Sequence, residues 1–114
     1  MSTRKVSAKQ ETGVAKRLGG KRQSNSGATP FQKGDVVTDL FAIECKTSMK
    51  PKKSISIQRG WIDKLKQEAF AMGKPNWAVA FDFGQTSTLG KPETFYIIDE
   101  LLFQWLLEKL EGEE

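Results

Sequence analysis

The run Lys33-Gly34-Asp35-Val36-Val37, followed closely by Ala42-Ile43-Glu44-Cys45-Lys46-Thr47, decides the fold that the sequence predicts. Successive side chains of a β-strand point to opposite faces, so Glu44 and Lys46 share one face of the second run. A short polar break separates the two runs and favours a tight turn, which makes them an antiparallel hairpin. The hairpin is expected to bring Asp35 beside Glu44. Two acids next to a lysine indicate a divalent-metal site with a cation at its edge.

A helix is expected upstream, over residues 5–18, and the glycine pair at 19–20 is a strong C-terminal stop. Residues 1–4 are expected to be disordered. Glu11 precedes the apolar residues of the helix by three, four and seven positions, and these residues are Val14, Ala15 and Leu18. That spacing puts the Glu11 carboxylate on the inward face. A carboxylate there needs a compensating cation or metal, unless it sits at the boundary and reaches water.

The ordered set of a helical Glu11, Ser26-Gly27, Gly34-Asp35 and Glu44-Cys45-Lys46, followed by an amphipathic helix, resembles the PD-(D/E)XK nuclease superfamily. In particular it is similar to the small Holliday-junction-resolvase-like and VRR-Nuc-like nucleases that phages often carry. The resemblance covers residues 5–80. It implies a single α/β domain over residues 1–114 with a restriction-endonuclease-like core of the αβββαβ type. In such a core a mixed sheet is flanked by helices, and here a C-terminal helix is added.

Phosphodiester hydrolysis by such a site requires Mg²⁺ or Mn²⁺, which prefer oxygen ligands. The expected oxygen donors are the side chains of Asp35 and Glu44, the carbonyl of Cys45, and Glu11 directly or through water. Lys46 is expected to orient the attacking water or to stabilise the developing negative charge. The resemblance adds Ser26, since a serine in this loop is associated with the active site in related enzymes.

Three further residues have competing interpretations. Asp39 is a rival of Asp35, but it lies at the expected turn, where aspartate commonly makes local hydrogen bonds, and it is assigned to that turn. A second helix is expected over residues 58–72, closed by Gly73. In this helix Trp61 is interpreted as a core anchor rather than a platform for stacking bases. Gln58 opens the helix, where a polar residue of the superfamily is often near the metals.

The C-terminal third is expected to add two strands and a helix. Residues 76–83 are predicted to form a central strand and residues 94–98 its antiparallel partner. Asp99-Glu100 is expected to cap the final helix. Residues 111–114 are expected to form an acidic end that frays. The helix has a wide apolar face made by Leu101, Leu102, Trp105, Leu106 and Leu110. Packing on the chain's own core is the simpler interpretation of this face, and contact with a second copy is the alternative.

Charge is unevenly distributed along the chain. Residues 1–57 carry a net charge of +8 and residues 58–114 a net charge of −4. A basic first half favours a polyanionic partner such as DNA, although solvated lysines without a partner are the alternative. The expected DNA contacts are polar or basic side chains of the loops: Lys21, Arg22, Ser26, Lys33, Lys50, Lys52 and Lys53. The chain has no histidine, which excludes histidine-dependent nucleases and most catalytic zinc sites.

The single cysteine excludes an internal disulfide and fits a reducing cytoplasm, so a cytoplasmic location is expected, with a phage-encoded protein as one possibility. No apolar run approaches the ~20 residues of a membrane span, and no secretory signal is expected. The leading hypothesis is therefore an endodeoxyribonuclease acting on branched DNA, expected to work as a homodimer. The alternatives are a flap nuclease of the VRR-Nuc type and a non-catalytic DNA-binding module that keeps the nuclease fold.

Overall fold

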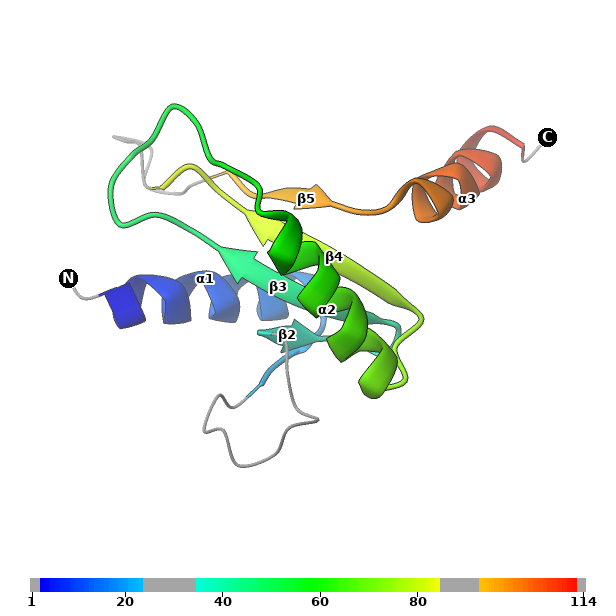
Figure 1. Cartoon of the computed structure of the whole chain (residues 1–114), viewed down its shortest axis with the longest axis horizontal. Helices are drawn as coiled ribbons and strands as arrows, with labels where there is room; N and C mark the ends of the chain where they lie inside the picture. The colour runs from blue at the N-terminus through cyan, green and yellow to red at the C-terminus, as the bar shows by residue number, and fades with distance from the viewer. Residues whose placement is uncertain (1–2, 24–34, 85–92, 113–114) are drawn as a thin grey trace.

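A computed structural model describes residues 3–23, 35–84 and 93–112 of the chain. The elements in these ranges are α1 (Thr3–Leu18), β1 (Lys21–Arg22), β2 (Val36–Val37), β3 (Phe41–Lys46), α2 (Arg59–Ala71), β4 (Asn76–Phe81), β5 (Phe95–Ile97) and α3 (Glu100–Glu111). The protein is therefore of the α/β class, as expected, and its described strands form one mixed sheet with helices on its faces (Figure 1).

The sheet has the strand order β1-β2-β3-β4-β5. Strand β2 is antiparallel to both β1 and β3, β3 and β4 are parallel, and β5 is antiparallel to β4. The chain passes from β3 to β4 through α2, because parallel neighbours need a crossover connection. The two strands predicted over residues 76–83 and 94–98 are confirmed as the shorter β4 and β5, which pair antiparallel, although β3 and not β4 is the middle strand of the described sheet. The carboxyl ends of β3 and β4 lie at the same edge of the sheet.

Each face of the sheet carries one helix and one half of the core. Behind the sheet in Figure 1, α1 contributes Val14 and Ala15 to a cluster with Val36 and Ile43. In front, α2 contributes Leu65 and Ala69 to a second cluster, which packs on alternate residues of β3 and β4. Since the side chains of β3 alternate between these clusters, Glu44 and Lys46 fall on the α2 face.

The hairpin predicted from the sequence is confirmed. The N–H of Asp35 donates to the Ile43 carbonyl and that of Thr38 to the Phe41 carbonyl, both at 3.0 Å. The Thr38 hydroxyl closes the turn by accepting from the Phe41 N–H at 3.1 Å. Asp39 is exposed in this turn, as assigned. The two acids that the sequence sets in competition therefore lie at opposite ends of the hairpin.

Three details of the first 23 residues differ from the prediction. The helix α1 begins at Thr3, so the disorder expected over residues 1–4 is wrong for Thr3 and Arg4. Leu18 is 43% exposed rather than inward, because α1 ends there and Gly19 turns the chain away with a φ of 68°. Lys21–Arg22 forms the edge strand β1 instead of a loop, because the backbone N–H and C=O groups on the outer side of β2 are free to pair with it.

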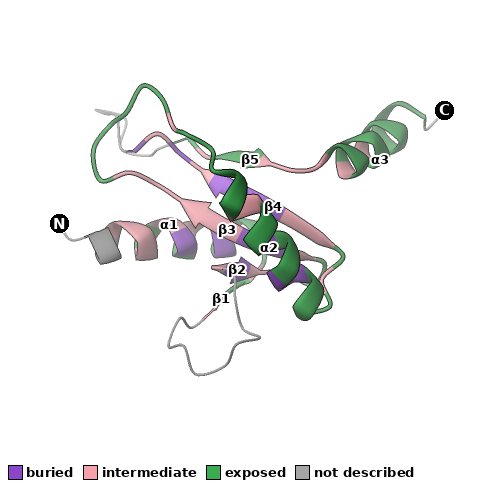
Figure 2. Cartoon of the chain, viewed as in Figure 1, coloured by how far each residue is buried: buried purple, intermediate pink, exposed green. Residues whose placement is uncertain are grey.

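The predicted cap of the last helix is confirmed, but its predicted packing is wrong. The Asp99 carboxylate accepts the Leu102 N–H at 2.9 Å. No residue of α3 is buried, and Figure 2 shows the helix without a buried segment. Only residues 98–99 separate β5 from α3, which projects from the sheet edge away from both core clusters (Figure 1). In the described part of the chain no helix combines the length and apolarity that crossing a bilayer requires.

Replacing Gly84 by alanine should destabilise the protein by about 1–3 kcal/mol. Gly84 has a φ of 87°, and a Cβ built on it would lie 2.6 Å from the Lys50 carbonyl oxygen. Urea unfolding followed by circular dichroism measures the effect. The matched control is Gly60→Ala in α2, where a Cβ meets nothing within 4 Å. Its stability should be unchanged or up to about 1 kcal/mol higher, and equal effects of the two changes would contradict the backbone assignment.

Candidate metal and nucleic-acid site

Asp35 directly precedes β2. Its side chain accepts a hydrogen bond from the backbone of β3 beyond the residues that pair with β2. Its Oδ2 accepts the Cys45 N–H at 2.7 Å, while its own N–H donates to the Ile43 carbonyl. Backbone groups two residues apart on a strand point to the same edge, so the Cys45 carbonyl faces this edge as well. The Asp35 carboxylate and the Cys45 carbonyl are therefore oxygen donors on one side of β3.

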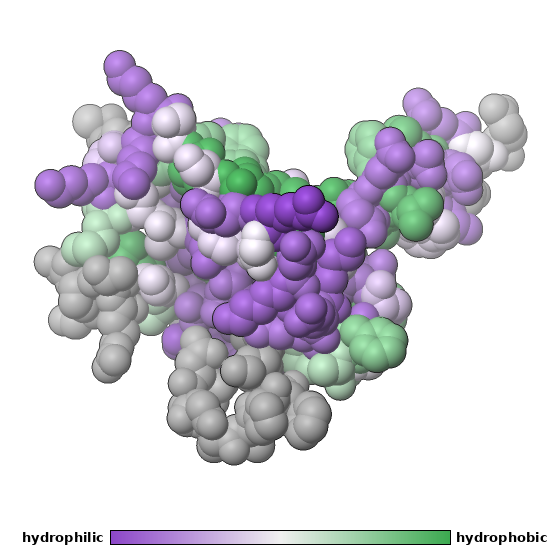
Figure 3. All heavy atoms as spheres, in the orientation of Figure 1, coloured by the Kyte–Doolittle hydropathy of each residue, from purple (hydrophilic) through white to green (hydrophobic). Residues whose placement is uncertain are grey.

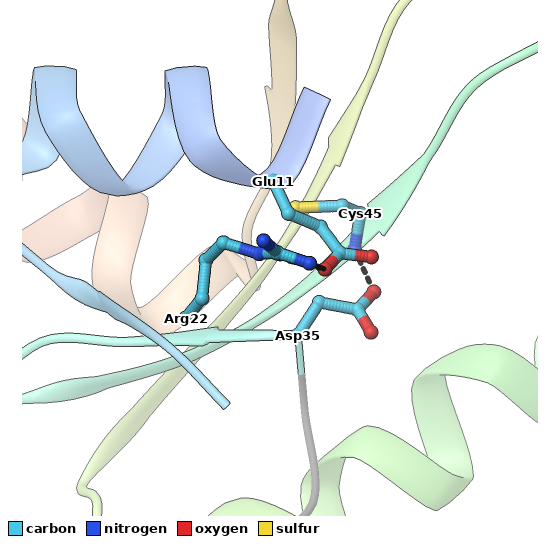
Figure 4. A network of polar contacts seen from close by, with 4 residues as sticks. All are labelled: Glu11, Arg22, Asp35 and Cys45. Atoms are coloured by element: carbon cyan, nitrogen blue, oxygen red, sulfur yellow. Dashed lines mark hydrogen bonds and ion pairs between the residues drawn. The ribbon is translucent and has the colours of Figure 1, made fainter. Parts of the chain in front are cut away.

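Glu11 approaches the same place from α1. It is only 8% exposed, on the inward face of the helix, as the spacing to Val14 and Ala15 predicted. The Arg22 guanidinium donates to its Oε1 from Nη2 at 3.2 Å and from Nε at 3.3 Å. Figure 4 shows the Glu11 carboxylate, held by Arg22, above the carboxylate of Asp35. The cation that a buried glutamate requires is thus Arg22, which stands on β1.

Glu44 and Lys46 form the pair that strand alternation predicts. The Lys46 Nζ lies 3.3 Å from the Glu44 Oε2. The same ammonium lies 4.4 Å from the centre of the Trp61 ring. Trp61 is partly buried on α2 and holds the lysine by a cation–π contact. It is not among the described residues that pack against either core cluster, so its interpretation as a core anchor is not confirmed. The contact with Lys46 is not evident from helical spacing.

The charges of the three acids are coupled through Asp35. Burial raises the pKa of Glu11, the negative charge of Asp35 raises it further, and Arg22 opposes both. Burial likewise raises the pKa of Glu44, with Asp35 adding to the rise and Lys46 opposing it. Asp35 is the neighbour that Glu11 and Glu44 have in common. Glu11 lies on the α1 face of the sheet and Glu44 on the α2 face, and Asp35 is the acid whose charge reaches both.

Cys45 stays a thiol in this setting. Burial raises its pKa well above the ordinary range, and the negative charges of the surrounding carboxylates add to the rise. Because the thiolate is the nucleophile and the metal ligand, a protonated Cys45 side chain is suited to neither role. The contribution of the Cys45 backbone carbonyl to a metal site stays a prediction.

The donor set is chemically suited to Mg²⁺ or Mn²⁺. All candidate ligands are oxygens, and Mg²⁺ is usually held by only one or two carboxylates, with water and substrate oxygens completing its shell. Asp35 paired with Glu44, or with Glu11, meets that requirement. Within the described residues, no group of three or more His, Cys, Asp and Glu side chains is close enough to hold a metal ion.

A second polar network, missed in the sequence, lies beside the acids. Asp82 is 2% exposed and accepts from the Thr47 hydroxyl at 2.6 Å and from the Gly84 N–H at 2.9 Å. Gln10 donates to the Lys46 carbonyl at 2.6 Å and lies 3.4 Å from Asp82 Oδ2. The network ties α1 to the carboxyl ends of β3 and β4, and so fixes Glu11, the next residue. A polar residue directly after a buried strand was the signal in the sequence.

The expected DNA contacts are only partly described. Ser26 and Lys33 lie outside the described residues. Lys21 is exposed on β1, and its neighbour Arg22 is engaged by Glu11. Long hydrophilic side chains project from the loop between β3 and α2 (Figure 3), which contains the exposed Lys50, Lys52 and Lys53. Gln58 is the N-cap residue of α2 and is exposed, and its side chain makes no capping hydrogen bond.

Comparisons with protein-family models, with curated proteins and with solved structures find no match for the chain.

The site should destabilise the metal-free fold, which a pH series can test. The pKa of Glu44 is raised above its ordinary value of 4.5, so the stability it contributes is fully present below pH 4.5 and is lost as the pH rises through its folded-state pKa. Glu44→Gln should therefore raise the free energy of unfolding at pH 7 in EDTA, with a difference that vanishes near pH 4. Urea unfolding at each pH measures it.

The matched control is Asp39→Asn, which removes a carboxylate exposed in the hairpin turn and should leave the free energy of unfolding unchanged at both pH values. A Glu44→Gln protein that is less stable than the wild type at pH 7 would contradict the assigned electrostatics, since the ion pair with Lys46 would then outweigh burial and Asp35.

Proposed function

We propose that this protein is a divalent-metal-dependent endodeoxyribonuclease that hydrolyses phosphodiester bonds in branched DNA. The observation that carries the proposal is the position of Asp35, whose charge acts on both Glu11 and Glu44 while its carboxylate is bonded beside the Cys45 carbonyl. Lys46, two residues beyond Glu44, adds an ammonium to the same strand. The element order from α1 to β4 also supports a restriction-endonuclease-like core.

Each residue of the site has a separate role in the proposed reaction. Asp35, Glu44 and the Cys45 carbonyl would hold the metal, and Glu11 would join them directly or through water. A bound Mg²⁺ supplies charge neutralisation at the scissile phosphate and favours deprotonation of water. Lys46 stabilises negative charge that develops in the transition state, and the Trp61 ring keeps its ammonium in position. Arg22 favours the ionised form of the Glu11 carboxylate, against the burial and the charge of Asp35 that raise its pKa.

The surroundings of the acids suit a DNA backbone. The loop that leaves β3 directly after Lys46 carries the exposed Lys50, Lys52 and Lys53. Cations at this end of the sheet would neutralise phosphates beside the acids and position the strand without reading its sequence. Branched DNA is proposed on the sequence resemblance to Holliday-junction-resolvase-like enzymes. The alternative substrate is flap DNA, which a VRR-Nuc-like enzyme would cut by the same chemistry.

A second candidate function is a DNA-binding module that does not cut. The observation that favours it is that the two outer acids already have protein cations, since Arg22 contacts Glu11 and Lys46 contacts Glu44 at 3.2 and 3.3 Å. Acids that are paired in this way can have a purely structural role, without binding a metal. Such a module would bind DNA in a salt-sensitive manner without any divalent metal.

The proposal predicts Mg²⁺-dependent cleavage that needs Asp35 and does not need Asp39. The purified protein is incubated with Mg²⁺ or Mn²⁺ and labelled four-way, flap, single-stranded and linear duplex DNA. Four-way junctions should be cut fastest. Asp35→Asn should lower the rate by at least about a hundredfold, because it removes an anionic ligand of the metal that would neutralise the scissile phosphate.

Asp39→Asn is the matched control, since it is the same change at the other end of the hairpin and should cut at the wild-type rate. Loss of cleavage in Asp39→Asn alone would reverse the assignment of the two acids. Metal-independent binding of every substrate, with no cleavage in any metal and no effect of Glu44→Gln on binding, would replace the nuclease by the binding module.

A further inference from the structure

The helix α3 is apolar around most of its circumference, yet it leaves its large side chains exposed. Leu101 is 75% exposed, Trp105 53% and Leu110 78%. At 3.6 residues per turn, the apolar positions of this helix cover about two thirds of its circumference. They are Leu101, Leu102, Phe103, Trp105, Leu106, Leu107 and Leu110. A helix with so wide an apolar surface is normally buried on more than one side. A groove can cover it in this way, whereas a flat surface cannot.

The structure contains a groove of matching length. A hollow of about 1580 Å³ runs along α1 from Val6 to Leu18 and is bounded by the loop after β3 and by Tyr96 of β5. The groove therefore follows about 18 Å of α1, at a rise of 1.5 Å per residue. The twelve residues of α3 span about the same length. In Figure 1 α3 lies on the opposite side of the molecule from the loop that bounds this groove.

The charges of the two surfaces are complementary. The groove is lined by the basic side chains of Lys9, Arg17, Lys50 and Lys52. The polar side of α3 is mainly acidic and carries Glu100, Glu108 and Glu111. An α3 helix seated in the groove would bury the middle of its apolar face, and its acids, which border that face, would lie near Lys9 and Arg17 of α1. Lys50 and Lys52 are on the loop that bounds the groove, where they stay available to DNA. Opposite charges that meet across a contact favour this partner over like-charged ones.

The connection between β5 and α3 directs the helix to another molecule. It consists of residues 98–99 only. Asp99 is extended, with φ −82° and ψ 165°, and its side chain caps α3 through the Leu102 N–H. Folding α3 back over its own groove would require a reversal within these two residues and would disturb the cap. An outward helix with an open groove of the same length is the arrangement in which two copies exchange an identical element.

We propose that the protein forms a dimer in which α3 of each copy lies in the groove between α1 and β5 of the other. A seam between two α3 helices alone would cover one side of each and leave both grooves open. Reciprocal exchange covers both helices and both grooves. This assembly gives the expected homodimer a defined contact and holds whether or not the protein cuts DNA.

Sedimentation equilibrium of the full chain tests the assembly. The wild type should have twice the monomer mass, and the double change Leu101→Glu with Leu110→Glu should reduce it to the monomer mass. The matched control is Phe70→Glu on α2, which makes the same kind of change at a large apolar side chain that is 87% exposed and should remain dimeric. Both sites are on the surface, so far-UV circular dichroism should be unchanged. A monomeric wild type, or a double variant that stays dimeric, would overturn the proposal.

Cross-linking identifies the partner surface. A photoreactive benzoylphenylalanine replaces Trp105, and ¹⁵N-labelled and unlabelled chains are mixed, unfolded and refolded together. After irradiation, mass spectrometry should find cross-links from position 105 of one isotopic copy to residues 6–18 of the other. Cross-links to α3 of the other copy would instead indicate a helix-to-helix seam, and cross-links to residues 6–18 of the same copy a helix folded back on its own chain. Either result would overturn the exchange.

Discussion

The hydrogen bond from the Cys45 N–H to the Asp35 carboxylate, at 2.7 Å, determines where the acids of this protein meet. Strand β2 is only two residues long, so β3 extends beyond it and needs another acceptor for its next N–H. The Asp35 side chain supplies that acceptor. Its charge is thereby held at the edge of β3, between a helix on one face of the sheet and the Glu44 side chain on the other.

The surrounding structure compensates for this concentration of negative charge. Arg22 reaches Glu11 from the edge strand β1, and Lys46 reaches Glu44 along β3 with the Trp61 ring beside it. Even so, burial and the shared neighbour Asp35 raise the pKa of Glu11 and of Glu44. Carboxylates that are held together against their mutual repulsion are more common at functional sites than elsewhere. This is the physical reason to propose a cation-dependent activity here.

The parts of this site that depend on local periodicity could be predicted from the sequence. Strand alternation predicts the Glu44–Lys46 pair, and helical spacing predicts the inward position of Glu11. The contacts that were missed connect residues far apart in the chain: Gln10 bonds to the Lys46 carbonyl, 36 positions away, and lies beside Asp82, 72 positions away. The strand at Lys21–Arg22 was missed because only the free edge of β2 makes it a strand.

The last helix illustrates another limit of sequence patterns. Its cap and its apolar residues could be predicted, since both follow from positions within the helix. The surface that those residues cover could not, because amphipathicity shows that a partner is needed and gives no information on which surface provides it. The short connection after β5 decides that α3 does not pack on the core clusters of its own chain.

The central claim is that Asp35 is the middle ligand of a divalent-metal site, and crystals grown with Mn²⁺ test it most directly. The account predicts an anomalous peak bonded to the Asp35 carboxylate and the Cys45 carbonyl, with Glu44 or Glu11 as the next oxygen donor. The contradicting result would be no anomalous peak near Asp35 at saturating Mn²⁺, with its carboxylate bonded to the Cys45 N–H and both outer acids still paired with Arg22 and Lys46.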